Sequence, residues 1–447
     1  MHRRRVAFAL AALSAASAGG PALAAGFALK EQSGTAQGNA FAGATAGADD
    51  ISYMFFNPAA LGMMSGDHQL VATGSLILAH MELQSASGTT GAGTPIGGSV
   101  PRHNIAEFAA VPALYGGLRL GEQWVAGLGI NAPFGLGTEY PDGWVGRYHA
   151  VDSSVKVIGV TPTLAYRPLP GLAFGAGLQA SHADASLSNA IDFGTIGAGL
   201  GIPGSLPGRQ DGFARVDGDD WQLGYTLGAL AEPISGTRIG IGYRSKVEHR
   251  LKGDADFSTA ASPTGRAIEA ATGAFADTGV GARIELPASA SIGIQQRITD
   301  RVDVMAEAAW TNWSRFDELR LTFDNPAQPD SVTEYKWKDS WFLALGATWR
   351  PRDDLTLRAG VAHDQTPVDE AHTTPRIPDG DRTWLSLGVG WMPLPWLSLD
   401  AAVTHIFVED AEVRLEASEP GNATRGDLDA DYDNSIDLVT ISAKLRF

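Results

Sequence analysis

Apolar and polar residues alternate along many segments of the chain, and this period of two residues predicts β-strands. The same alternation runs through residues 341–350, 355–361, 385–391 and 397–404. These segments are long, have aromatic residues near their ends, and carry small or charged residues on their second face. This combination is typical of strands that face lipid outside and a polar lumen inside, and a soluble antiparallel sheet is the disfavoured alternative. In the C-terminal segment the outward set is Val439, Ile441, Ala443, Leu445 and Phe447, opposite Thr440, Ser442, Lys444 and Arg446.

The connections between these segments alternate between short and long. Short turns are expected near Gly121, 168–171, 235–237, 299–301, 351–354 and 393–395, and longer loops near 86–107, 141–151, 193–220, 259–280, 325–333, 369–381 and 416–433. Short periplasmic turns and long outer loops are the asymmetry of outer-membrane barrels, which have an even number of strands. We therefore predict an all-β fold, a transmembrane antiparallel β-barrel of about 14 strands formed by residues 67–447.

Residues 25–66 lack this alternation and are too apolar for a free tail. Asp49 and Asp50 are expected to cap a short helix, and Asn57-Pro58-Ala59 is expected to begin another, because Asn caps well and Pro fits a first turn. A barrel of about 14 strands would leak unless its lumen were filled. We therefore predict that residues 25–66 form a helical plug, or hatch, with Asn57, Pro58 and Ala59 among its gating residues.

The first 24 residues read as a secretory signal peptide. Arg3-Arg4-Arg5 is followed by an apolar run over 6–16 and by Ala22-Leu23-Ala24, a small-residue cleavage site. The rest of the chain has no apolar run near the roughly 18 residues of a membrane-spanning helix. It has no Cys and a net charge of -17, which argues against disulfides and against nucleic acid as a partner.

Several short motifs occur in order along the chain: Ala25-Gly26-Phe27, Glu31-Gln32-Ser33, Ala40 to Gly43, Ala48-Asp49-Asp50, Asn57-Pro58-Ala59, Phe134-Gly135-Leu136, Thr138-Glu139-Tyr140, Leu286-Pro287, Thr311 to Ser314, Trp337-Lys338-Asp339, Ile377-Pro378-Asp379, Asp381-Arg382 and Trp384-Leu385-Ser386. With their order and spacing, the chain resembles the FadL family of outer-membrane transporters of long-chain fatty acids and related hydrophobic compounds. The resemblance implies passive uptake, no enzymatic activity and no cofactor. It also implies an outer-membrane location among lipid and lipopolysaccharide, and we expect a monomer.

The resemblance also implies a route for the ligand. It would be caught by a groove in the outer loops, where Ile196, Leu200, Ile202 and Phe275 supply apolar surface, and then pass to an internal pocket beside Phe27. Residues 264–276 read as a short amphipathic helix in this region. The alternative is that these apolar residues only pack on one another as a lid.

Lys338 is the candidate for binding a carboxylate head group. If Trp341, Leu343 and Leu345 face lipid, the alternation places Lys338 inside, where a buried cation needs an anion. That anion is either a fatty acid carboxylate or an inward acid such as Glu307 or Asp303. Residues 181–190 contain no Arg or Lys for a second head-group contact, so a neutral aromatic hydrocarbon is an alternative ligand.

The third predicted strand, residues 124–140, loses its alternation at Asn131-Ala132-Pro133-Phe134-Gly135. Pro cannot donate to a β-ladder and Gly weakens one. The strand either ends here or, as the resemblance implies, Pro133, Phe134 and Gly135 form a kink that opens a lateral exit in the wall.

Other chemistry is weakly indicated. Asp427, Asp429, Asp431 and Asp433 resemble half of a calcium loop, but its Gly and Glu are missing, so a solvated acidic loop is favoured. The His residues lack zinc spacing, and G-x-S-x-G is absent. We predict no metal and no catalytic residues. An open porin or an adhesin remains an alternative, and a barrel phospholipase is more distant.

Overall fold

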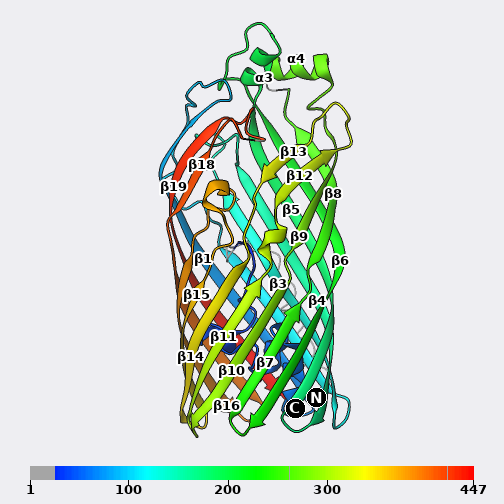
Figure 1. Cartoon of the computed structure of the whole chain (residues 1–447), viewed down its shortest axis with the longest axis vertical. Coiled ribbons are helices and arrows are strands. Elements are labelled where there is room, and N and C mark those ends of the chain that lie inside the picture. Colours follow the sequence, from blue (N-terminus) through cyan, green and yellow to red (C-terminus); the bar gives the residue numbers. More distant parts are fainter. Residues whose placement is uncertain (1–25, 261, 420) are drawn as a thin grey trace.

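The computed structural model describes residues 26–260, 262–419 and 421–447, and it shows a closed antiparallel β-barrel (Figure 1). Its 19 strand segments form one sheet, and five crossings consist of two segments each, which leaves fourteen crossings as predicted. The predicted signal peptide, residues 1–24, lies outside the described residues. The crossings are β1 (His68–Thr89), β2 (Ala109–Arg119), β3 (Trp124–Glu139), β4 (Asp152–Leu169), β5 (Leu172–Asp192), β6 (Asp211–Ile234), β7 with β8 (Thr237–Arg244, Val247–Phe257), β9 with β10 (Thr278–Leu286, Ser289–Thr299), β11 with β12 (Val302–Thr311, Glu318–Phe323), β13 with β14 (Ser331–Glu334, Ser340–Arg352), β15 (Leu355–Asp364), β16 (Arg382–Leu394), β17 with β18 (Leu397–Val408, Ala411–Leu415) and β19 (Asp427–Arg446).

The barrel closes by antiparallel pairing of β1 with β19, from Gln69 opposite Arg446 to Thr89 opposite Asp427. Closure satisfies backbone groups that lipid cannot hydrogen-bond. Short turns lie at the end that holds the C-terminus, and the long loops form a crown at the other end, with α3 (Phe193–Gly199) and α4 (Pro263–Thr272) (Figure 1). None of the described helices is both long and apolar enough to span a bilayer.

The predicted alternation is confirmed in the wall. On β14 the outward Leu343 and Leu345 are 49% and 64% exposed, whereas the inward Phe342 and Ala344 are buried. A soluble sheet would bury such an aliphatic face, so this outward belt fits a lipid surface.

Two predicted loops are shorter than expected, because β6 begins at Asp211 and β19 at Asp427. The four acidic residues 427, 429, 431 and 433 therefore lie on β19 rather than in a loop. The strand continues above the lipid belt, where its outward positions turn acidic and its inward ones, Leu428, Ala430 and Tyr432, turn apolar. This reversal of polarity hides a strand from a search for lipid-facing alternation.

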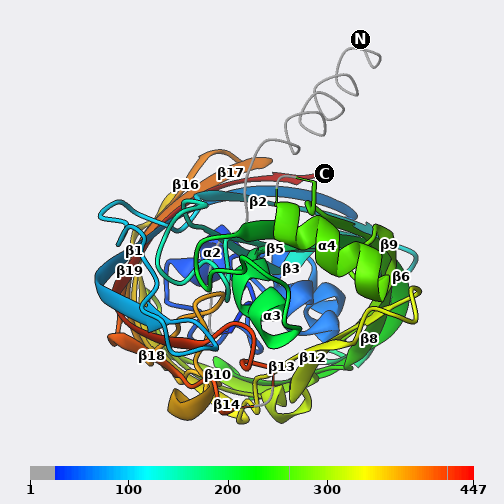
Figure 2. The same cartoon turned by 90° about the horizontal axis from the view of Figure 1, so that it is seen from above.

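The hatch lies inside the ring of strands (Figure 2). It contains α2 (Gly34–Gln37) and the 3-10 helices η2 (Ile51–Phe55) and η3 (Pro58–Met63), joined by tight turns. Asp50, rather than Asp49, caps η2 through a hydrogen bond from the Ser52 amide. Asn57 caps η3 by accepting from the Ala59 amide, with Pro58 in the first turn as predicted.

Glycines in the wall make room for the hatch. A Cβ at Gly228 would lie 1.9 Å from Asn57 Oδ1, and one at Gly175 would lie 2.3 Å from the Pro58 carbonyl carbon. Asn57 Nδ2 also donates to the carbonyls of Thr45 (2.7 Å) and of Ala229 in β6 (3.0 Å). Asn57 therefore joins two parts of the hatch to the wall.

A buried ionic cluster of Lys444, Asp50, Asp400 and Arg358 holds the hatch. Lys444 Nζ lies 2.7 Å from Asp50 Oδ2 and 2.9 Å from Asp400 Oδ2, and Arg358 Nη1 lies 2.8 Å from Asp400 Oδ1. Burial acts to raise the pKa of Asp50, but Lys444 and the hydroxyls of Ser52 and Thr35 outweigh it and lower that pKa to about 2. The stability from Asp50 is thus present above its ordinary pKa of 3.8 and is lost as the pH falls through about 2.

Removing the cation of this cluster should loosen the hatch. Lys444→Met leaves two buried carboxylates with one less cation, a change that costs about 3–5 kcal/mol in buried pairs. Proteoliposomes carrying it should swell in sugar solutions. Asp50→Asn should leak less, because Lys444 keeps Asp400. Asp67→Asn is the control, since its side chain is 79% exposed. A sugar-tight Lys444→Met barrel would contradict this role of the cluster.

Candidate ligand site

Six aromatic residues gather where the hatch begins, and we call them the Phe27 cluster: Phe27, Phe134, Trp313, Phe316, Tyr335 and Trp337. The Phe27 ring centroid lies 4.9 Å from that of Trp313, 5.6 Å from that of Phe316, and 5.8 Å from those of Phe134 and Trp337. Edge-to-face contacts of this kind add to the stabilisation from burial. The cluster places Phe27 at the centre of the barrel's apolar interior.

Asp339 connects two of the sequence motifs that build this cluster. Its carboxylate accepts from Asn312 Nδ2 (2.9 Å), from the Ser314 amide (3.0 Å) and from Trp310 Nε1 (3.2 Å). These bonds tie the turn around Trp313 to the segment that carries Trp337. Trp313 and Trp337 are thereby held together, with ring centroids 5.0 Å apart, and both contact Phe27.

Asp379 anchors the beginning of the hatch. Its Oδ2 accepts from the Gly26 amide at 3.0 Å, and its Oδ1 pairs with Arg382 Nη2 at 2.6 Å. Gly26 has a left-handed φ of 61°, and a Cβ there would lie 2.7 Å from the Trp337 ring. Glycine is therefore required at this position.

The predicted break in β3 is present, with a bulge between Asn131 and Phe134 in the pairing with β4. On its other side, β3 pairs with β2 only as far as Ile130. Beyond that point the hatch takes the place of β2: the Leu29 amide donates to the Pro133 carbonyl (2.8 Å) and the Gly135 amide to the Phe27 carbonyl (2.9 Å). Thus Pro133, Phe134 and Gly135 bend inward, and the ladder between β2 and β3 is open.

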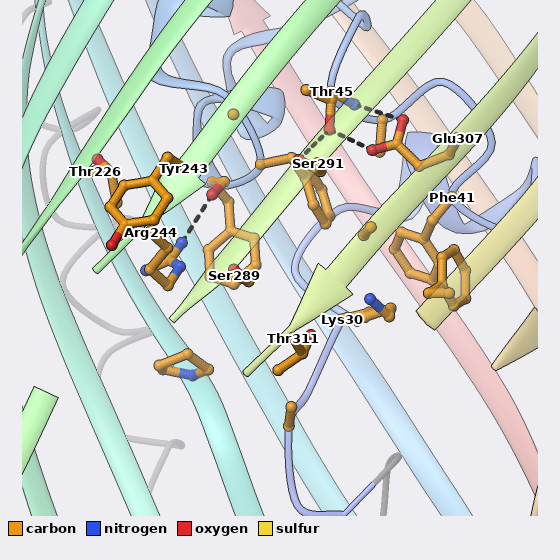
Figure 3. A pocket seen from close by; sticks show the side chains of 18 of the residues that line it. Lys30, Phe41, Thr45, Thr226, Tyr243, Arg244, Ser289, Ser291, Glu307 and Thr311 are labelled. Atoms are coloured by element: carbon orange, nitrogen blue, oxygen red, sulfur yellow. Dashed lines mark hydrogen bonds between the residues drawn. The ribbon is translucent and has the colours of Figure 1, made fainter. Parts of the chain in front are cut away.

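A cavity of about 110 Å³ lies beside this bend (Figure 3). Cavities of similar size in proteins hold a single aromatic ring. A longer ligand must therefore extend past it, toward the Phe27 cluster. Its lining includes Ala28, Leu29, Lys30, Phe41, Phe55, Phe56, Pro133, Phe134, Tyr243, Arg244, Glu307 and Phe342.

Two cations line this mainly apolar cavity. Lys30 Nζ lies 4.2 Å from the Phe342 ring centroid, and Arg244 donates to Gln179 Oε1 (2.6 Å) and to the Phe55 carbonyl (2.8 Å). Among the described residues, neither Lys30 nor Arg244 forms an ion pair with a carboxylate. Glu307 accepts instead from the Thr45 amide (3.1 Å) and hydroxyl. The cations are thus available to an anionic ligand.

Glu31 adjoins Lys30 in the hatch and is fully buried. Burial raises the pKa of this carboxyl to about 7, against the opposing effects of Arg382 and Lys30. Below that pH the group is mostly protonated and neutral, and above it the group is increasingly a carboxylate beside Lys30.

Lys338 does not lie in this cavity, so the prediction that it faces inward is wrong. Its side chain is 70% exposed and its Nζ lies 2.5 Å from Asp369 Oδ2 rather than near Glu307 or Asp303. β14 starts at Ser340, and residues 335–339 before it belong to no strand, so its alternation does not extend back to Lys338. The Lys338 amide donates instead to the Pro367 carbonyl, at 2.8 Å. Arg244 follows the alternation of β7 and was identifiable from it; Lys30 carries no such signal.

The apolar loop residues are divided between a lid and an exposed surface. Phe275 packs on Phe193 and Phe257, with ring centroids 5.1 and 5.7 Å apart, as the lid alternative requires. Ile196 on α3 and Ile202 after it are half-buried, whereas Leu200 is 53% exposed. Figure 2 shows α3 and α4 above the lumen. Elsewhere in the described chain no group of three or more His, Asp or Glu is arranged to hold a metal.

The closed wall, the hatch and the apolar interior define a class of proteins, the outer-membrane barrels that carry ligands past an internal plug. A family described as outer membrane protein transport protein (OMPP1/FadL/TodX) matches residues 15–447, so the chain belongs to this family. The predicted family and outer-membrane location are thereby confirmed.

Individual relatives are similar to this chain over most of its length. The chain is 32% identical to the 47 kDa outer membrane protein of Pasteurella multocida, over 89% of this chain and 90% of that protein. It is 28% identical to a long-chain fatty acid transport protein of Escherichia coli K12, over 87% of this chain and 89% of that protein. The crystal structure of a Pseudomonas aeruginosa FadL homologue superposes with a TM-score of 0.85 at 27% identity, covering 95% of this chain and 100% of that one.

Gly26→Ala should release the start of the hatch from the wall, because the added methyl clashes with Trp337 and the left-handed backbone is strained. The amides of Leu29 and Gly135, which bridge the hatch and β3, should exchange with deuterium faster. Gly97→Ala is the matched control, since no atom lies within 4 Å of its Cβ position. Unchanged exchange over residues 27–36 in Gly26→Ala would contradict the anchoring role.

Proposed function

We propose that this protein takes up long-chain fatty acids or similar hydrophobic compounds passively across the outer membrane. The observation that carries the proposal is the apolar cavity lined by Lys30 and Arg244, with no carboxylate paired to either among the described residues. An ionised carboxylate would satisfy a cation there, and an acyl chain would contact the Phe27 cluster. Membership in the transport family and the named activity of the Escherichia coli relative support the same ligand class.

The proposed route has three stages. Apolar side chains around α3 and α4 capture the ligand, and the candidates are the exposed Leu200 and the half-buried Ile196, Ile202 and Phe275. It then moves to the cavity beside Phe27 and Lys30, and leaves sideways between β2 and β3 at Pro133, Phe134 and Gly135. Residues 25–66 act as the hatch, with Asn57, Pro58 and Ala59 seating it. Residues 67–447 act as the wall, and residues 1–24 direct export.

An aromatic hydrocarbon is the second candidate ligand. The cavity is close to the size of one aromatic ring, and Phe41, Phe55, Phe56, Phe134 and Phe342 line it. A neutral ligand would leave Lys30 and Arg244 without a role in recognition, so a charge-removing substitution separates the two ligand classes.

The remaining partners follow from the wall. Its exposed aliphatic belt contacts outer-membrane lipid, and the outward crown faces lipopolysaccharide. A closed barrel leaves no sheet edge for a second copy to pair with, which favours a monomer. Transport needs no catalytic residue, so we assign no enzymatic activity.

Lys30→Gln should weaken binding of a long-chain fatty acid by about tenfold or more, since a charge-assisted hydrogen bond is worth roughly 1.5–3 kcal/mol. Binding of the methyl ester should change little. The measurement is equilibrium binding of both compounds to purified protein. Lys338→Gln is the matched control, because it removes the same charge from an exposed position outside the cavity. Equal losses for acid and ester would favour the neutral-ligand alternative.

The lateral exit is tested by restoring the ladder of β3. Pro133→Val with Gly135→Thr supplies a missing backbone donor and two β-formers, so the strand can pair with β2. Uptake should fall sharply while the folded barrel and ligand capture at the crown persist. If uptake stays normal in a variant whose crystal structure shows β2 and β3 fully paired, the ligand leaves by a path through a moving hatch instead.

A further inference from the structure

A second cationic cavity lies in the crown, apart from the one beside the hatch. Its volume is about 230 Å³, and loops that are distant in the sequence meet around it. Arg376 comes from the loop before β16, Arg425 from the loop between β18 and β19, and His149 from the loop between β3 and β4. The other charged residues that line it are Glu334, Lys336, His372 and Glu419.

The two guanidinium groups have only neutral partners among the described residues. Arg376 donates to the carbonyls of Asp152 (2.9 Å) and Ser188 (3.0 Å) and to Ser153 Oγ (2.8 Å). Arg425 donates to the hydroxyls of Thr333 (3.1 Å) and Ser331 (3.0 Å). Burial and the charge of Arg376 lower the pKa of Arg425 to about 10, so both groups are still cationic at neutral pH.

Neither acid on the cavity wall is ion-paired with these two arginines. Glu334 is ion-paired with Lys336, and Glu419 Oε2 accepts from Asn422 Nδ2 at 3.0 Å. His149 is 4% exposed, and its Nε2 has no hydrogen-bond partner in the described chain. Burial and the charge of Arg425 lower the pKa of His149 to about 3, so the ring is neutral. The cavity therefore has two arginines without an ion-pair partner among the described residues, and one buried ring nitrogen without a hydrogen-bond partner.

Tyr335 connects this cavity to the Phe27 cluster. Its ring lies 4.7 Å from Phe316 and 5.9 Å from Trp337 between centroids. In the chain Tyr335 stands between Glu334 and Lys336, and both of these residues line the cavity. The segment that lines the cavity thus also contributes a ring to the aromatic interior.

We propose that Arg376 and Arg425 form a crown site for the carboxylate head group of an amphiphile, whose chain extends along Tyr335 toward the Phe27 cluster. This rests on the proposed function only in taking the amphiphile to be the transported ligand. Paired guanidinium groups match the planar geometry of a carboxylate. The head group is then held first in the crown and again at Lys30, with aromatic rings between the two positions.

The test is equilibrium binding of decanoate, methyl decanoate and inorganic phosphate to the full chain in zwitterionic nanodiscs. Arg425→Gln is preferred to a change at Arg376, which holds loop carbonyls. Arg425→Gln should weaken decanoate binding at one of two sites by about ten- to a hundredfold. Arg425→Lys keeps the charge and should recover most of that loss. Arg320→Gln is the control, because this exposed crown arginine pairs with Glu318 and Asp330.

A double variant that combines Arg425→Gln with Lys30→Gln separates this inference from the proposed function. If both hold, each single variant loses one decanoate site and the double variant loses both. If only the crown site exists, Lys30→Gln binds as the unmodified chain does. Unchanged decanoate binding in a heat-modifiable Arg425→Gln barrel would overturn the crown site. Phosphate binding as tightly as decanoate would overturn its assignment to an amphiphile.

Discussion

The lumen of a fourteen-crossing wall is too wide for the wall's own side chains to fill, and this constraint shapes the rest of the molecule. The hatch fills the space, so inward wall positions become glycine where its backbone approaches, as at Gly175 and Gly228. Its charged groups must then be neutralised away from water, which Lys444 does for Asp50. The hatch and the wall are therefore complementary surfaces, and the residues of each at their contact are determined by the other.

The interior forms a graded environment between crown and hatch. Arg376 and Arg425 provide charge at the top, the Phe27 cluster provides an apolar middle, and Lys30 and Arg244 provide charge again below. An amphiphile moving inward would exchange one cationic contact for another without placing its head group in an uncharged region for long.

Much of this was predictable from the sequence, for definable reasons. Strands in lipid carry a strict alternation, and helix caps such as Asn57 act within a few residues, so both are local signals. The prediction failed where the local rule changed. On β19 the polarity reverses above the membrane, and residues 335–339 before β14 leave the strand, so the faces of β14 do not extend back to Lys338. Arg376 and Arg425 are brought together only by the packing of crown loops, which no periodicity records.

The bend in β3 has a further consequence for how the molecule works. The Leu29 amide donates to β3 and the Phe27 carbonyl accepts from it, in place of hydrogen bonds that β2 would otherwise make. The hatch therefore serves as a short additional strand of the wall. The segment that obstructs the axial path is thus also the segment that seals the side. Withdrawing this segment would therefore both free a strand edge and clear the lumen, and the two openings would be coupled.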